Sequence, residues 1–228
     1  MPLGSKITRE YILESQPLKE FFVFENEIRT LAIEAFQNVL DDLKSQERHV
    51  QKCLADNPEI LVQCLGGGHG RWVIPQKRLG AEFVPDFVIG EKHSGGFFWK
   101  AVEIESPRAR PFTKKGDPSS PLTHAIRQIL DWRSWLTRNQ GYAARDRSEQ
   151  GLGLTDIHGQ LPGLVLLGRR ENFPESSKEL RRQMELANNI SIHSFDWLVE
   201  VAGARCNHWE GYYESLERIV VPWESKDK

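Results

Sequence analysis

Three acidic residues stand at comparable positions in two strand-like stretches of the chain. Asp86 lies in "EFVPDFVI", and Glu103 and Glu105 lie in "GFFWKAVEIE". Because successive side chains of a strand point to opposite faces, Glu103 and Glu105 share one face. Carboxylates gathered on one face repel each other unless a cation neutralises them, and their oxygen atoms suit Mg²⁺ or Mn²⁺. The pattern predicts a divalent metal site of the kind that supports phosphodiester hydrolysis.

The residues that alternate with these acids are apolar. They are Val102 and Ile104 in one stretch and Phe87 and Ile89 in the other. If they pack against one helical layer, the three carboxylates face the other side of the sheet. The alternative is that Glu103 and Glu105 lie on a solvent-facing edge strand, where their charges need no partner.

A helix is expected to bring further polar groups to this site. The stretch "SPLTHAIRQILDWRSWL" starts with Ser120 and Pro121, a favourable N-cap and first-turn pair, and is predicted to continue to about Thr137. His124 and Gln128 are four residues apart and therefore lie on one helix face. They are candidates for contact with a phosphate. The alternative is an ordinary polar helix side.

The elements around these stretches describe an α/β protein. An amphipathic helix is predicted over 27–43, with an apolar stripe that runs from Ile28 through Leu31 to Leu43, and a second helix follows Ser45. The stretches 71–77, 82–89 and 96–105 are typical of an antiparallel meander, and "GLVLLG" of a buried parallel strand. Helical and strand patterns alternate after it, including a last helix in "YESLERIVV".

This order of elements predicts a mixed β-sheet flanked by helices. We expect residues 1–44 to form an N-terminal helical segment that packs on or extends a domain formed by residues 45–228.

Basic residues gather near the candidate site, although the whole chain has a net charge of only −2. Residues 69–147 contain 14 Lys and Arg against 8 Asp and Glu, and the segments on both sides are net acidic. Arg108, Arg110, Lys114 and Lys115 follow the glutamate strand and are candidates for sequence-independent phosphate contacts. The alternative is that they are ordinary solvated charges.

Other classes of protein are disfavoured. The glycine-rich "LGGGHG" is not followed by Gly-Lys-Ser/Thr, which excludes a P-loop. We expect a cytoplasmic protein with no membrane partner, because no apolar run is long enough for a bilayer and a signal peptide is not recognised. The three cysteines are predicted to be reduced, and Cys206 with His208 makes only an incomplete zinc pair. The seven tryptophans stand mostly at apolar positions and are expected in the core.

The motif formed by Pro85-Asp86 and the later Glu-x-Glu resembles that of the PD-(D/E)xK nuclease superfamily. A wider part of the chain, residues 45–170, resembles the nuclease domain of the Shedu antiphage defence proteins. This resemblance is carried by "ERHVQKCLADNPEIL", by "LGAEFVPDFVIG", by "VEIESPRARPFTKKGDPSSPLTHAIRQILDWRSWL" and by "GLVLLGRR".

The resemblance implies a restriction-endonuclease-like core in which Asp86 and Glu103 bind the metal. It also implies that Glu47, on the helix before the meander, adds a metal ligand and that Gln128 belongs to the catalytic site. The family protects bacteria against phage by nicking or cutting DNA, commonly as an oligomer. We therefore expect a Mg²⁺- or Mn²⁺-dependent DNA endonuclease that forms a homodimer or homotetramer.

One position departs from the superfamily motif, which has a lysine two residues after the glutamate. Here that position holds Glu105. Some restriction enzymes of the superfamily carry glutamate there, and Glu105 would then act as general base or second-metal ligand. Alternatively Lys114 or Lys115 reaches the site, since Lys100 has the wrong strand parity. The third alternative is a catalytically inactive nucleic-acid-binding sensor or assembly subunit. A sugar hydrolase is disfavoured, because Glu103 and Glu105 lie side by side and cannot flank a substrate.

Overall fold

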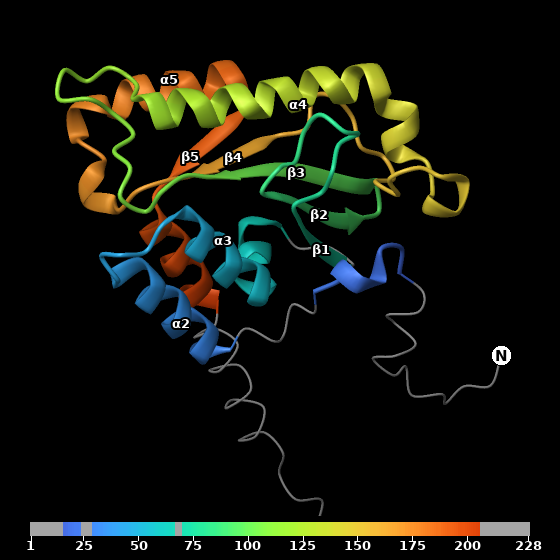
Figure 1. Cartoon of the computed structure of the whole chain (residues 1–228), viewed down its shortest axis with the longest axis horizontal. Helices are drawn as coiled ribbons and strands as arrows, with labels where there is room; N and C mark the ends of the chain where they lie inside the picture. The colour runs from blue at the N-terminus through green and yellow to red at the C-terminus, as the bar shows by residue number, and fades with distance from the viewer. Residues whose placement is uncertain (1–15, 24–28, 67–69, 206–228) are drawn as a thin grey trace, which may run out of the picture.

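A five-stranded β-sheet forms the centre of the computed structural model, which describes residues 16–23, 29–66 and 70–205. Helices cover both faces of the sheet (Figure 1). One face is covered by α4 (Ser120–Ala144) and α5 (Lys178–Asn188), and the other by α2 (Thr30–Asp41), α3 (Glu47–Asp56) and a helix over 195–205. This architecture confirms the predicted α/β class with a mixed sheet between helices.

The strands follow chain order across the sheet. They are β1 (Gly70–Pro75), β2 (Phe87–His93), β3 (Gly96–Ile104), β4 (Gly163–Leu166) and β5 (Ile190–His193). The first three pair antiparallel, as the predicted meander requires, and β4 pairs parallel with both β3 and β5. Parallel neighbours need a crossover connection, which α4 supplies between β3 and β4 and α5 supplies between β4 and β5. Every residue of β4 is buried, as expected for a central parallel strand.

The alternation of side chains divides the core into two clusters. Phe87, Val102 and Ile104 pack with residues of α2 and α3. Val88 and Ala101 point to the other face and pack with residues of α4. This parity confirms the prediction that the apolar residues between the acids face one helical layer.

The helix α2 is shorter than the sequence pattern predicted, and Ile28 lies outside the described residues. Its buried residues are Ala32, Phe36 and Leu40. The wider stripe was wrong at Leu31 and Leu43, whose exposed fractions are 74% and 83%. The physical reason is that only one narrow line of α2 contacts the core, and Leu43 lies beyond the end of the helix.

The helix α4 begins and ends at other residues than predicted. Ser119, instead of Ser120, is the N-cap, and its side chain accepts a hydrogen bond from the Leu122 backbone N–H. The helix continues to Ala144, beyond the predicted end at about Thr137. Asn139 has non-helical backbone angles within this helix, and its side-chain amide donates to the Trp135 carbonyl.

Short 3-10 turns join several of these elements. They are Lys19–Phe21, Pro58–Cys64, Arg147–Glu149, Arg170–Asn172 and Glu175–Ser177. Four tryptophans are buried as predicted, namely Trp72, Trp99, Trp132 and Trp135. Trp209, Trp223 and the predicted helix in "YESLERIVV" lie outside the described residues. Within residues 16–23, 29–66 and 70–205, no helix combines the length and apolar content that crossing a bilayer requires.

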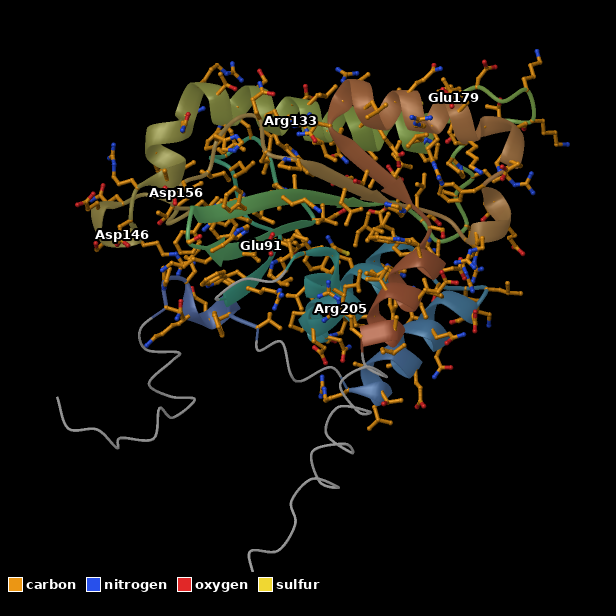
Figure 2. The ribbon with its side chains drawn as sticks, turned by 180° about the vertical axis from the view of Figure 1, so that it is seen from behind. Glu91, Arg133, Asp146, Asp156, Glu179 and Arg205 are labelled. Carbon is orange, nitrogen blue, oxygen red and sulfur yellow. The ribbon has the colours of Figure 1, made fainter. Side chains whose placement is uncertain are left out.

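A buried arginine on α4 holds two connections in place. Arg133, labelled in Figure 2, is 8% exposed. Its guanidinium donates to the carbonyls of Leu161 at 2.9 Å, Asn188 at 2.5 Å and Asn189 at 2.8 Å. One side chain thereby fixes both the segment that enters β4 and the end of α5.

We predict that Arg133→Met lowers the free energy of unfolding by about 2–4 kcal/mol, because three carbonyl groups lose their donor. Urea denaturation followed by circular dichroism measures this change. Arg127→Met is the matched control, since the Arg127 side chain is on the same helix and 80% exposed. Equal stability of the two variants would contradict the prediction.

Candidate active site

The strand register brings the motif acids together at one end of the sheet. Phe87, the first residue of β2, pairs with Val102 of β3. Asp86 precedes that pair and Glu103 follows it, so the two acids lie beside each other. Their side chains are close enough to interact, with a protonated Glu103 as the donor to Asp86. Glu105 lies one residue beyond the end of β3.

Helices from both layers reach this end of the sheet. From α4, the Gln128 side-chain amide donates to Glu103 Oε1. From α3, the Gln51 side-chain amide donates to Asp86 Oδ1 at 2.5 Å. The second oxygen of Asp86 accepts from the backbone N–H of Ile104 at 2.8 Å. The acids therefore occupy the junction between the two helical layers and the sheet.

Gln51 is a contact that the sequence analysis missed. It lies four residues after Glu47 on α3, and this spacing places both side chains on one helix face. Because Glu47 was already a candidate ligand, the same spacing that linked His124 to Gln128 could have identified Gln51.

His124 and Glu47 complete the group. His124 Nδ1 lies 3.4 Å from Glu105 Oε1, and the side chains of these residues are 64% and 15% exposed. Glu47 begins α3 and interacts electrostatically with His124, Asp86 and Glu103. The structure thus brings together every residue that was predicted to bind the metal or to act in catalysis, together with His124.

Burial and mutual repulsion raise the pKa of these carboxyl groups. Burial, followed by the charge of Glu47, raises the pKa of Asp86 to about 6, although the Ile104 N–H opposes this change. Burial, then the charges of Asp86, Glu105 and Glu47, raises the pKa of Glu103 to about 10. Burial also raises the pKa of Glu105 and of Glu47, and His124 partly offsets both increases. The surroundings therefore compensate the negative charge of these acids only in part.

The donor set fits a hard divalent cation. Among the described side chains, none of these four acids forms an ion pair with lysine or arginine, and the imidazole of His124 lies 3.4 Å from Glu105. Four carboxylates with raised pKa values and oxygen-only donors match what Mg²⁺ or Mn²⁺ prefers. No group of three His, Cys, Asp or Glu side chains is already at metal-ligand spacing within the described residues. The acids can raise one another's pKa without being at ligand spacing, because electrostatic repulsion acts over longer distances than metal ligation. In this structure the side-chain amides of Gln51 and Gln128 donate hydrogen bonds to Asp86 and Glu103.

The basic residues predicted to contact phosphate are placed differently from one another. The Arg108 guanidinium donates to the carbonyls of Leu40 and Asp42, both at 2.7 Å. Arg110 and Lys114 line a hollow of about 240 Å³ between the loops that follow β3 and β4, and Lys115 is exposed.

The lysine with the wrong parity is indeed directed away from the acids. Lys100 Nζ donates to the Cys64 carbonyl, on the face that carries α3. Cys53 and Cys64 are unpaired, and burial raises the pKa of the Cys64 thiol to about 12. The predicted weak zinc pair, Cys206 and His208, lies outside the described residues.

Comparison with known proteins places this chain in a family. Residues 44–199 match the family model described as "Shedu protein SduA, C-terminal". None of the curated proteins matches the chain. Among solved structures, the Ca²⁺ complex of Pyrococcus furiosus SfsA is similar, with 12% sequence identity and a TM-score of 0.28. That match covers 65% of this chain and 55% of SfsA, so the chain spans about half the length of that structure. The family assignment therefore rests on the sequence match, which covers most of the chain.

The match covers both β2 and β3, which carry or adjoin the paired acids, and the α4 helix that follows them. The chain belongs to the Shedu protein SduA C-terminal family, the nuclease domain of the Shedu antiphage defence proteins.

Proposed function

We propose that this chain is a Mg²⁺-dependent DNA endonuclease, with Mn²⁺ as an alternative ion, that nicks or cuts phage DNA. The observation that carries the proposal is the convergence of Asp86, Glu103, Glu105 and Glu47 without a lysine or arginine partner among the described residues. The mutual repulsion of such a cluster destabilises the folded state unless a cation binds and neutralises it.

Asp86, Glu103 and Glu47 would hold the ion. When bound, the ion would polarise the phosphate and lower the pKa of water. Gln51 and Gln128 would orient the carboxylates of Asp86 and Glu103, which they already contact. The backbone N–H of Ile104 fixes one oxygen of Asp86 in the same way.

Glu105 would take the place of the usual motif lysine. Its raised pKa suits a group that accepts a proton from the attacking water, and His124 beside it would share that proton. The alternative is that a loop lysine takes the role of the motif lysine. Lys114 and Lys115 contact none of the four acids in the described structure, so we favour Glu105 over this alternative.

We predict that Glu105→Gln lowers the nicking rate by roughly 10²-fold, the usual scale of general-base catalysis. Glu105→Lys should recover part of this loss, because it restores the superfamily motif. Initial rates on supercoiled plasmid measure both effects. A Glu105→Gln rate equal to that of the original chain would contradict the assigned role.

The proposal includes the DNA contacts and the assembly. Arg110, Lys114 and Lys115 would contact backbone phosphates beside the site, and Arg108 would join them if it left the carbonyls of α2. We also propose a cytoplasmic homodimer or homotetramer, and a division into a helical segment over 1–44 and a nuclease domain over 45–228.

The test is incubation with supercoiled plasmid in Mg²⁺, in Mn²⁺ and in EDTA. Metal-dependent conversion to the relaxed or linear form supports the enzyme. Absence of cleavage in both metals, with a retained gel shift, would reject it.

A second candidate function is a catalytically inactive DNA-binding sensor or assembly subunit. It is favoured by the amide contacts that Gln51 and Gln128 make to the acids, since a protonated Glu103 in such contacts needs no metal. The gel shift without cleavage described above is the result that this candidate predicts.

A further inference from the structure

Two loops lie side by side where β3 and β4 end, and a row of hollows opens between them. The loops leave the sheet next to Glu105, whose N–H donates to the Leu166 carbonyl, and the Gly168 N–H donates to the Ser106 carbonyl. In Figure 1 they form the end of the molecule opposite the connection that follows α4. One hollow, of about 170 Å³, lies at the start of α5.

Two buried polar atoms in this hollow have no hydrogen-bond partner among the described residues. They are Ser177 Oγ and Arg181 Nε. Ser177 is 2% exposed, and both side chains line the hollow. A buried polar group without a partner costs free energy, so we expect a water, a ligand or an ion to satisfy these two atoms.

The groups around these atoms are mainly cationic donors. Arg170 and Lys178 also line the hollow, against one acid, Glu175. Glu175 is bound by Lys178 at 3.0 Å, and Arg170 forms an ion pair with Glu200. Arg181 has no such acidic partner in the described structure. Its guanidinium lies 5.6 Å above the Phe173 ring, which holds it over the hollow.

A hydroxyl and an uncompensated guanidinium in one small hollow are suited to a tetrahedral oxyanion. They donate hydrogen bonds and supply positive charge, and the hollow offers no set of oxygen ligands for a cation. The neighbouring hollow carries Arg110 and Lys114 and shares Phe112 and Pro174 with this one. A chain of regularly spaced phosphates could therefore occupy both.

We propose that Ser177 and Arg181 form a binding site for a phosphate group of the DNA backbone, next to the phosphate contacted by Arg110 and Lys114. This inference rests on the proposed function for the identity of the polymer. The bound DNA backbone would then run from the acids along the loops after β3 and β4 to the start of α5. The site would contact phosphates only and would not distinguish base sequence.

Duplex binding measured by fluorescence anisotropy in EDTA, over a series of salt concentrations, tests this site without cleavage. We expect Arg181→Gln to weaken binding roughly tenfold and to reduce the slope of log K against log salt by about 1, as for one lost phosphate contact. Ser177→Ala should weaken binding severalfold without changing the slope, because it removes a neutral donor. Arg182→Gln is the matched control, since Arg182 is the next residue of α5 and its side chain is 72% exposed. Thermal unfolding of each variant verifies the fold.

Equal binding by Arg181→Gln and Arg182→Gln would overturn the site, whether both are weakened or neither is. A free phosphate ligand is the other source of the same chemistry. If inorganic phosphate stabilised the original chain but not Arg181→Gln, while duplex affinity was unchanged, the DNA assignment would also be overturned. Failure of the proposed function has a different signature, since it would appear as absence of metal-dependent plasmid cleavage with these binding effects intact.

Discussion

Asp86→Asn and Glu103→Gln are each expected to reduce Mg²⁺-dependent plasmid nicking by on the order of 10³-fold or more, since each removes a ligand charge from the ion that stabilises the transition state. Both substitutions keep the shape of the side chain. The amide of Asp86→Asn has one acceptor oxygen instead of two, so it can accept from only one of Ile104 and Gln51. The amide of Glu103→Gln does not ligate a hard cation as a carboxylate does. Single-turnover nicking rates at saturating protein measure the loss independently of DNA affinity.

The matched control for this loss is Asp131→Asn. Asp131 lies on α4, the helix that carries Gln128, but its side chain is 49% exposed and pairs with Arg127. This variant should nick DNA at the rate of the original chain. If Asp86→Asn and Glu103→Gln, folded as judged by circular dichroism, also kept that rate, the acids would not be the catalytic group.

The second large effect concerns stability against pH in the absence of metal. Because the pKa of Asp86 is about 6 and that of Glu103 about 10 in the folded chain, above the ordinary values of 3.8 and 4.5, the folded state binds more protons than the unfolded state. The contribution of these two groups to stability should therefore be greatest below about pH 4. It should be lost as the pH rises through their pKa values in the folded state. Urea denaturation between acidic and mildly basic pH measures this fall.

Glu103→Gln should show less of this fall. A tenfold change in proton affinity corresponds to about 1.4 kcal/mol, so at mildly basic pH without metal we expect the variant to be more stable than the original chain by about 1–3 kcal/mol. Saturating Mg²⁺ should reverse the order, because a ligand at a hundredfold excess over its Kd adds roughly 3 kcal/mol to the protein that binds it. Stability of the original chain that is insensitive to both pH and Mg²⁺ would contradict this account of the acids.

Much of the fold could be predicted because local patterns agree with the tertiary environment. The alternation of Val102 and Ile104 with Glu103 correctly predicted which face of β3 is buried against α2 and α3, since a strand has only two faces. The same parity correctly directed Lys100 away from the acids. The apolar run in "GLVLLG" predicted a central parallel strand, because helices on both faces leave no position for a polar side chain.

Other features depend on contacts that no local pattern encodes. Leu31 and Leu43 have the spacing of a buried helix face, yet both are exposed. A different side of α2 packs against the core, and Leu43 lies beyond the end of the helix. Arg108 follows the glutamate strand, but its partners are the carbonyls at the end of α2, 66 and 68 residues away. Arg169 reaches the same end through Leu40 and Asp41. The sequence shows that Arg108 is a positive charge close to the acids along the chain. Its actual hydrogen-bond partners depend on how α2 packs on the sheet.

The central claim is that Asp86, Glu103 and their neighbours form one divalent metal site. Titration of Mn²⁺ followed by electron paramagnetic resonance tests it directly, because free and protein-bound Mn²⁺ give different signals. We predict saturable binding in the original chain that is lost in both Asp86→Asn and Glu103→Gln and retained in Asp131→Asn. Binding that survives both acid substitutions, or an original chain that binds no Mn²⁺ with or without duplex DNA, would contradict the claim.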